Sequence, residues 1–207
     1  MNSGKVWRKA RMVMLGAMAM GLMLPGPAAA QFSKSYNFLE HVKKKEGQEV
    51  TDALAEPGTT IINTQDVSNG QTALHIVTER RDATWISFLL GKGADPNIRD
   101  TKGQTPLMVA ANYGFTEGVE LLIKGGARVD EPNSTGETPL ISAVHRRDIT
   151  LLRVLVKAGA NPDRADSSGR SARDYAKLDR NDTLINELNS NTKKPEAGNG
   201  RFYGPSL

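Results

Sequence analysis

Residues 103–130 read GQTPLMVAANYGFTEGVELLIKGGARVD, and this stretch forms a complete structural unit. Thr105 precedes Pro106, a pairing that begins a helix, because threonine caps the N-terminus and the missing N–H of proline costs nothing in the first turn. Gly114 ends that helix. A second apolar run over residues 119–123 predicts another helix, which the following Gly-Gly-Ala brings to an end. The stretch therefore predicts two short helices joined by a turn.

The unit recurs at a fixed period. Its opening threonine or serine returns every 33 residues, at Thr72, Thr105, Thr138 and Ser171. The closing Gly-Ala pair keeps the same period of 33 residues and begins at Gly93, Gly126 and Gly159. Two markers that repeat in register indicate stacked copies of one helix-turn-helix unit.

The repeated unit resembles the ankyrin repeat, a helix-turn-helix of about 33 residues that opens with T-P-L-H-x-A. The residues that carry the resemblance are TALHIV at 72–77, TPLMVA at 105–110 and TPLISA at 138–143, with the closing turns GADPN at 93–97 and GANPD at 159–163. The resemblance covers about residues 36–188. It implies an all-α ankyrin-repeat solenoid in which the polar segments 99–103, 132–136 and 165–169 form projecting β-turn fingers.

The resemblance also implies an order of units along the chain. A flexible lead-in at 31–34 precedes an N-terminal capping unit at 35–68, whose helices span residues 35–46 and 48–56 with Gly47 between them. Three full repeats follow at 69–101, 102–134 and 135–167, with first helices at 73–80, 106–113 and 139–146 and second helices at 83–91, 116–124 and 149–157. A C-terminal capping unit occupies 168–188, because an end unit must meet solvent on one face, and a disordered tail occupies 189–207.

The first 30 residues have the three parts of a secretory signal peptide. Four basic residues precede 13 uncharged, mostly apolar residues at 12–24, and Ala28-Ala29-Ala30 offers small side chains for cleavage between Ala30 and Gln31. A membrane anchor is the alternative, but a spanning helix needs about 20 apolar residues and this run ends at Pro25. The sequence therefore predicts a periplasmic or secreted protein without a membrane anchor after cleavage.

Removal of the signal changes the charge of the chain. The whole sequence has 27 basic and 23 acidic residues, a formal net charge of +4. The signal contains four of the basic residues and none of the acidic ones, so the mature chain has 23 of each. A neutral chain gives no reason to expect nucleic acid or anionic lipid as a partner. The absence of cysteine excludes disulfides and thiolate metal ligands.

Candidate catalytic groups are few. The histidines are His41, His75 and His145. By the resemblance, His75 is a structural residue that holds the backbone of a neighbouring turn, and no second histidine aligns with His145 for metal binding. Patterns of zinc proteases, serine hydrolases and phosphate loops are absent. The sequence predicts neither an enzyme nor a metal or cofactor site.

Arginines recur at the turn between the two helices, at Arg81, Arg147 and Arg180. The resemblance implies glycine and a left-handed backbone at this place, and Gly114 keeps that glycine. One interpretation is an arginine stripe for an acidic partner. The other, which we favour, is a solvated turn in which Asp82 and Asp148 cap the next helix and offset the positive charge.

The predicted binding residues lie on the first helices. In ankyrin repeats, the residue after T-P-L-H and the two residues after the following Ala-Ala face a concave groove. The residues predicted in this way to bind protein are Ile76, Arg80, Val109, Asn112, Tyr113, Ser142, His145, Arg146 and Tyr175. Apolar and aromatic side chains amid mixed charge are typical of a protein-binding surface, although ordinary surface apolarity would look the same.

These observations predict a monomeric, non-enzymatic protein–protein interaction scaffold that is exported to the periplasm. It would bind another protein through the concave groove and the β-turn fingers. The alternative is a binder of an envelope polymer or a small ligand in the same groove, which a deep aromatic-lined pocket would favour. Repeat proteins share one scaffold and differ in their surface residues, so the sequence does not identify the partner.

Overall fold

A computed structural model describes residues 27–56 and 58–190 of the chain. Within these residues ten α-helices and one short 3-10 helix follow one another without any strand, and one isolated antiparallel bridge joins Ala165 to Ser171. The elements are α1 (Pro27–Lys44), α2 (Gly47–Ala55), η1 (Ile61–Asn63), α3 (Ala73–Glu79), α4 (Ala83–Gly91), α5 (Pro106–Asn112), α6 (Thr116–Lys124), α7 (Pro139–His145), α8 (Ile149–Lys157), α9 (Ala172–Leu178) and α10 (Asp182–Ser190).

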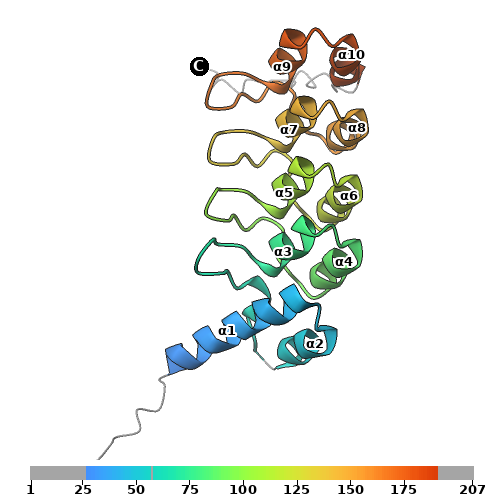
Figure 1. Cartoon of the computed structure of the whole chain (residues 1–207). Helices are drawn as coiled ribbons and strands as arrows, with labels where there is room; N and C mark the ends of the chain where they lie inside the picture. The colour runs from blue at the N-terminus through green and yellow to red at the C-terminus, as the bar shows by residue number, and fades with distance from the viewer. Residues whose placement is uncertain (1–26, 57, 191–207) are drawn as a thin grey trace, which may run out of the picture.

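The helices form two parallel rows (Figure 1). The first row contains α1, α3, α5, α7 and α9, and the second row contains α2, α4, α6, α8 and α10. Each first-row helix packs against the next one along the row, and α4, α6, α8 and α10 do the same in the second row. Four hairpin-like loops project from the N-terminal ends of α3, α5, α7 and α9. This arrangement confirms the predicted all-α ankyrin solenoid.

The first-row helices begin at the predicted caps. The hydroxyl of Thr105 accepts a hydrogen bond from the N–H of Met108, and the hydroxyl of Thr138 accepts one from Ile141, each at 3.3 Å. A proline follows both threonines at the first helical position, where it has no N–H to leave unpaired. These caps fix where each seven-residue helix starts, and the loop before it becomes the finger.

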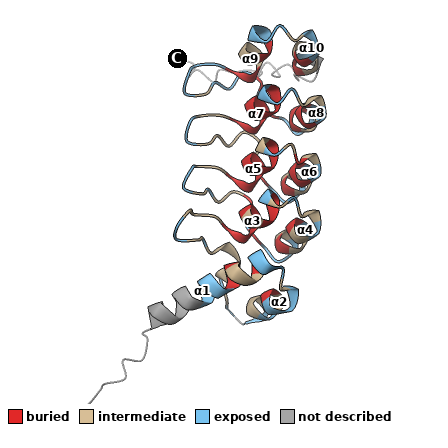
Figure 2. Ribbon diagram, in the orientation of Figure 1, coloured by how far each residue is buried: buried red, intermediate tan, exposed pale blue. Residues whose placement is uncertain are grey.

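Burial concentrates where the two rows meet (Figure 2). Ile86 and Leu89 of α4, Val119 and Leu122 of α6, and Leu152 and Leu155 of α8 have no exposed surface. Burying one such side chain contributes about 1.5–3 kcal/mol, whereas helices of seven to nine residues are too short to persist alone in water. Contact between neighbouring repeats therefore supplies the stability of each repeat.

The backbone between the paired helices is left-handed, as predicted. The angle φ is 56° at Arg81, 54° at Arg147, 49° at Arg180 and 62° at Gly114. Asp82 and Asp148 then cap α4 and α8 by accepting the N–H groups of Trp85 and Leu151, which confirms their predicted role.

The ends of the stack differ from the prediction. Helix α1 begins at Pro27 rather than at residue 35, so residues 31–34 are helical and not a flexible lead-in. The left-handed residue between α1 and α2 is Lys45 (φ 62°), and Gly47, predicted to separate the helices, is the first residue of α2. Helix α10 extends to Ser190, beyond the predicted boundary at 188. The predicted tail from residue 191 and the predicted signal residues 1–26 lie outside the described residues, whereas Ala30 and Gln31 lie in α1.

Successive fingers are joined by backbone hydrogen bonds. The N–H groups of Thr101, Ser134 and Ser167 donate to the carbonyls of Asn69, Lys102 and Thr135 in the preceding finger, at 2.9 to 3.1 Å. A glycine with positive φ closes each finger, and at Gly70, Gly103 and Gly136 an added Cβ would lie within 2.9 Å of the next finger's backbone. The fingers therefore form a continuous ladder beside the first-row helices.

Candidate interaction surface

The predicted binding residues lie on α3, α5, α7 and α9 or on the turns after these helices. The residue after the T-P-L-H position is Ile76, Val109, Ser142 and Tyr175 in successive units. The residues near the C-terminal ends of these helices are Arg80, Asn112, Tyr113, His145 and Arg146. The structure therefore brings all nine onto one side of the stack, but it exposes only some of them.

Val109 and Ser142 were expected in the groove, and this expectation is wrong. Val109 is 3% exposed and Ser142 is 4% exposed. The hydroxyl of Ser142 donates a 2.7 Å hydrogen bond to Oδ1 of Asn112 in the preceding repeat. Val109 lies in the second full repeat and Ser142 in the third, so each has a neighbouring unit on both sides. These two side chains support the stack and cannot contact a partner.

Ile76 and Tyr175, predicted to face the groove, are half-buried and pack against the core. The hydroxyl of Tyr175 donates a 2.7 Å hydrogen bond to Oδ2 of Asp166 in the last finger. This bond, together with those from Ser168, lowers the pKa of Asp166 to about 2. Tyr175 therefore braces the last finger against α9.

Arg80 is also held by contacts within the chain. Its Nη1 donates to the carbonyl of Val42 at 2.5 Å, and its Nε lies 3.3 Å from Oδ2 of Asp82. The guanidinium carbon lies 5.0 Å from the centre of the Trp85 ring. Arg80 thus fastens the C-terminal end of α1 to the first repeat.

Tyr113 is the more exposed of the two tyrosines among the nine predicted residues, with 43% of its surface exposed. The guanidinium carbon of Arg81 lies 6.0 Å from its ring centre, and Nη2 of Arg81 donates to the Tyr113 carbonyl at 2.5 Å. From the following repeat, Nη1 of Arg146 donates to the carbonyl of Asn112 at 3.0 Å. Two arginines therefore meet at the C-terminal end of α5.

His145 is exposed and lies against Tyr175. The two rings meet edge to face, with 4.5 Å between their centres. Nδ1 of His145 lies 3.3 Å from Oε1 of Glu137, which comes from the finger of the same repeat. The imidazole is therefore held between a finger carboxylate and the neighbouring aromatic ring.

His75 is buried and holds a neighbouring turn, as the resemblance implied. Its Nδ1 accepts the Thr72 N–H at 3.1 Å, so its Nε2 carries the proton that it donates to the Gln104 carbonyl at 3.0 Å. Burial lowers the pKa of His75, although the bond to Gln104 acts in the opposite direction. The neutral ring thus joins the first repeat to the next finger.

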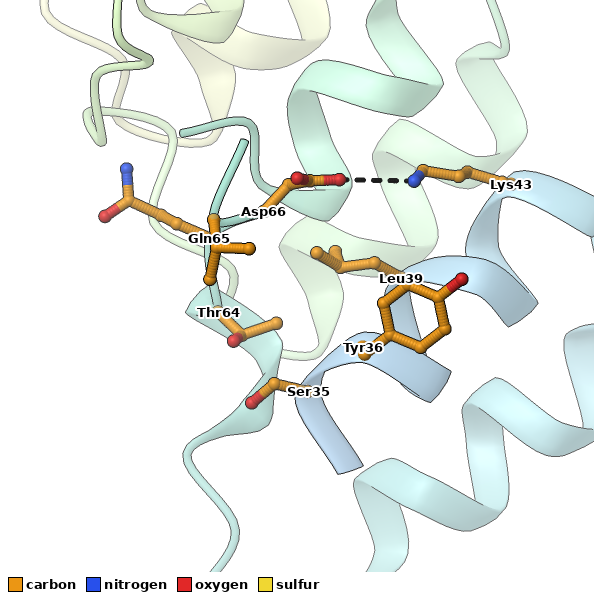
Figure 3. Close-up of a pocket in the computed structure, with 8 residues that line it drawn as sticks. Ser35, Tyr36, Leu39, Lys43, Thr64, Gln65 and Asp66 are labelled. Atoms are coloured by element: carbon orange, nitrogen blue, oxygen red, sulfur yellow. Dashed lines mark hydrogen bonds and ion pairs between the residues drawn. The ribbon is translucent and has the colours of Figure 1, made fainter. Parts of the chain in front are cut away.

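Leu178, at the end of α9, occupies the place of Asn112 and His145 in its unit and is 65% exposed. One further surface feature was not predicted. A hollow of about 260 Å³ lies between α1 and the segment 64–67, and Figure 3 shows Tyr36 and Leu39 on one side of it with Thr64 on the other. The ion pair between Lys43 and Asp66, at 3.2 Å, crosses its edge. Only the folded connection brings these two segments together, so spacing along the chain gave no signal.

Within the described residues, no three histidine, aspartate or glutamate side chains gather as a metal site would require. No helix in the same part of the chain is long and apolar enough to cross a membrane. Exposed side chains at the C-terminal ends of the first-row helices include Tyr113, His145, Arg146 and Leu178.

This fold and surface define a class of protein, the helical-repeat solenoid, in which short stacked units present one continuous face. A family model described as ankyrin repeats (3 copies) matches residues 28–133 and 81–166. The chain therefore belongs to the ankyrin-repeat family. Ankyrin repeats generally mediate protein–protein interaction, and proteins that contain them are typically non-enzymatic scaffolds. A comparison with curated proteins gave no match.

Proposed function

We propose that this chain is an exported, non-enzymatic scaffold that binds a partner protein through its concave groove and fingers. The observation that carries the proposal is the row of exposed Tyr113, His145 and Leu178 at the ends of three successive first-row helices. Short helices stacked on a buried core hold these side chains at fixed spacing. A rigid aromatic and apolar row is the kind of surface in which binding energy concentrates.

Export is supported by the sequence alone. The basic residues before position 12, the apolar run at 12–24 and the three alanines at 28–30 have the order of a cleaved signal. N-terminal sequencing of the exported chain should begin at Gln31. A full-length chain retained in the membrane fraction would contradict both the cleavage and the periplasmic location.

The binding test uses the mature chain as bait in an envelope extract, with captured proteins identified by mass spectrometry and then purified. Tyr113→Ala should weaken capture about thirtyfold or more, because truncation of a central aromatic anchor typically costs about 2 kcal/mol or more. Tyr175→Phe is the matched control, because it keeps the ring against His145 and removes only the hydroxyl, with its bonds to Asp166 and Ser168. Equal capture by both variants, with unchanged melting curves, would move the interface away from the groove.

The alternative function, binding of an envelope polymer or a small ligand in the groove, has less support. Aromatic-lined hollows lie elsewhere: one beside Tyr36, and one of about 270 Å³ lined by Trp85 and Phe88 near α2. Both are smaller than the roughly 300–1,000 Å³ typical of ligand sites. We therefore retain protein binding as the proposal.

A further inference from the structure

We infer that the row of helix–helix turns is a docking edge for an acidic segment of the partner, with Tyr113 as its apolar anchor. We define this turn edge as residues 44–46, 80–82, 113–115, 146–148 and 179–181. It forms the rim of the groove farthest from the fingers, because the fingers precede the first-row helices and these turns follow them. The inference rests on the proposed function, since it names the chemistry of the partner.

The turn edge is positively charged although the mature chain is neutral. Its basic residues are Lys44, Lys45, Arg80, Arg81, Arg146, Arg147 and Arg180, and its acidic residues are Glu46, Asp82, Asp148 and Asp179. All four carboxylates are engaged within the chain. Glu46 lies 2.5 Å from Nδ1 of His41 and Asp179 lies 3.0 Å from Nε of Arg147. Asp82 and Asp148 cap helices. With seven basic and four acidic residues, the turn edge has a formal charge of +3.

The backbone at these turns does not require the basic residues. Lys45, Arg81, Arg147 and Arg180 all have φ between 49° and 62°, a conformation that costs a side chain on the order of 1–2 kcal/mol relative to glycine. Gly114 shows that glycine serves at the same place. Contacts with the next repeat account for Arg81 and Arg147. They do not account for Arg180, whose side chain has no hydrogen-bond or ion-pair partner among the described residues.

Two arginines without an ion-pair partner among the described residues lie together next to Tyr113. Arg147 is paired with Asp179 and Lys45 with Asp82, but Arg81 and Arg146 donate to main-chain carbonyls, which leave the charge of a guanidinium in place. Each guanidinium has five N–H donors, and one hydrogen bond is present on each. Both groups are exposed, one beside the Tyr113 ring and the other against Gly114.

An aromatic ring beside the Arg81 guanidinium, with the Arg146 guanidinium at the neighbouring Asn112 and Gly114, suits an apolar side chain that has carboxylates next to it in sequence. Arginine binds carboxylates through paired N–H donors, and the exposed Tyr113 ring accepts apolar contact. Electrostatic attraction along the edge would also guide the partner into register and raise the association rate. The partner is therefore expected to carry an acidic segment interrupted by an aromatic or branched apolar residue.

The test uses the mature chain and a short fluorescein-labelled peptide in which glutamates flank a Phe-Leu pair, followed by fluorescence anisotropy. We expect the peptide to bind, the corresponding glutamine and lysine peptides not to bind, and high salt to weaken the complex. Arg81→Asn and Arg146→Gln should each weaken binding about two- to fivefold, and Tyr113→Ala about tenfold. Asn is chosen at position 81 because it tolerates the left-handed backbone. Arg164→Gln, an exposed change outside the turn edge, is the matched control.

Several results would overturn the inference. The first is no binding of the glutamate peptide, and the second is that Arg81→Asn and Arg146→Gln bind it as tightly as the unmodified chain does. The third is equally tight binding of a DNA oligonucleotide, which would indicate a general anion surface. The proposed function is judged separately with the captured partner. If Tyr113→Ala weakens that partner while Arg81→Asn and salt have no effect, groove binding stands and the acidic edge is excluded. If the peptide binds the edge but no protein is captured, the proposed function is excluded instead.

Discussion

The third full repeat and the C-terminal unit have the same finger but different neighbours. Gly136 has φ of 79° and Gly169 has φ of 77°, so the two loops have the same backbone at this point. A Cβ added at Gly136 would lie 2.6 Å from the nitrogen of Ser167, whereas a Cβ at Gly169 would meet nothing within 4 Å. The comparison shows that the shape of a unit is set locally, while the residues it tolerates are set by the next unit.

The largest expected effect separates these two glycines. Gly136→Ala should destabilise the fold by about 2–4 kcal/mol, because the methyl group forces the two fingers apart in addition to straining φ. Gly169→Ala should cost only about 1–2 kcal/mol, the strain alone. Thermal and urea unfolding followed by circular dichroism would measure both values. Equal losses would mean that the ladder between fingers adds little to stability.

A second comparison concerns His75 and Met108, which occupy the same place in α3 and α5. The folded pKa of His75 is lowered by burial, so the unfolded chain binds the proton more readily. Stability should therefore fall as the pH drops below about 6.5, with a slope of at most about 1.4 kcal/mol per pH unit, and level off below the folded pKa.

His75→Met, which copies the next repeat, should abolish this slope between pH 7 and pH 5. It should also lower stability at neutral pH by about 1–3 kcal/mol, because Gln104 loses its hydrogen bond. Urea unfolding across this pH range gives both quantities. An unchanged slope in the variant would assign the pH dependence to other groups.

Replacing an arginine in the left-handed conformation with glycine should have a smaller effect on stability, and it should stabilise the fold. Arg180→Gly should stabilise the chain by a few tenths to about 1 kcal/mol, because relief of strain exceeds the added freedom of the unfolded glycine. Arg147→Gly should stabilise it less, since it also removes the ion pair with Asp179. Melting temperatures rank the two variants. A loss of stability in Arg180→Gly would show that this side chain has a structural partner.

The smallest expected effect on melting concerns Tyr175 in the C-terminal unit. The equivalent residues of the second and third repeats are Val109 and Ser142. The Tyr175 hydroxyl is the main cause of the lowered pKa of Asp166. Tyr175→Phe should raise that pKa from about 2 towards the ordinary value of 3.8, as followed by carboxyl chemical shifts in an NMR titration. Ser168→Ala removes a weaker contribution and should shift it less. A pKa that stays near 2 in Tyr175→Phe would contradict the assignment.

Much of the repeat architecture could be predicted because it depends on nearby residues. The second helices of all three repeats have the predicted bounds, and each first helix ends one residue before its predicted end. The resemblance implied the left-handed turns, and the aspartates before the second helices predicted the caps at Asp82 and Asp148. A cap bonds to an N–H three residues away and a turn is set by its own φ angles, so these features require no knowledge of the fold.

The binding face was predicted less well because exposure depends on neighbouring repeats. Val109 and Ser142, in the middle of the stack, are buried, whereas Ile76 and Tyr175, nearer its ends, are only half-buried. Helix α1 also begins earlier than expected. The alanines before Gln31 favour helix, and the same residues match the cleavage site of a signal peptide.

The sequence by itself determined the period, the caps, the left-handed turns and hence the stack of helix pairs, because each depends on hydrogen bonds and backbone angles within a few residues. Only the tertiary structure decided which side chains of that stack remain open. It buried Val109, fastened Arg80 to α1 and brought Arg81 and Arg146 to the main-chain carbonyls of Tyr113 and Asn112. Those outcomes depend on atoms about a repeat or more away in sequence, and they exist only once neighbouring repeats have packed together.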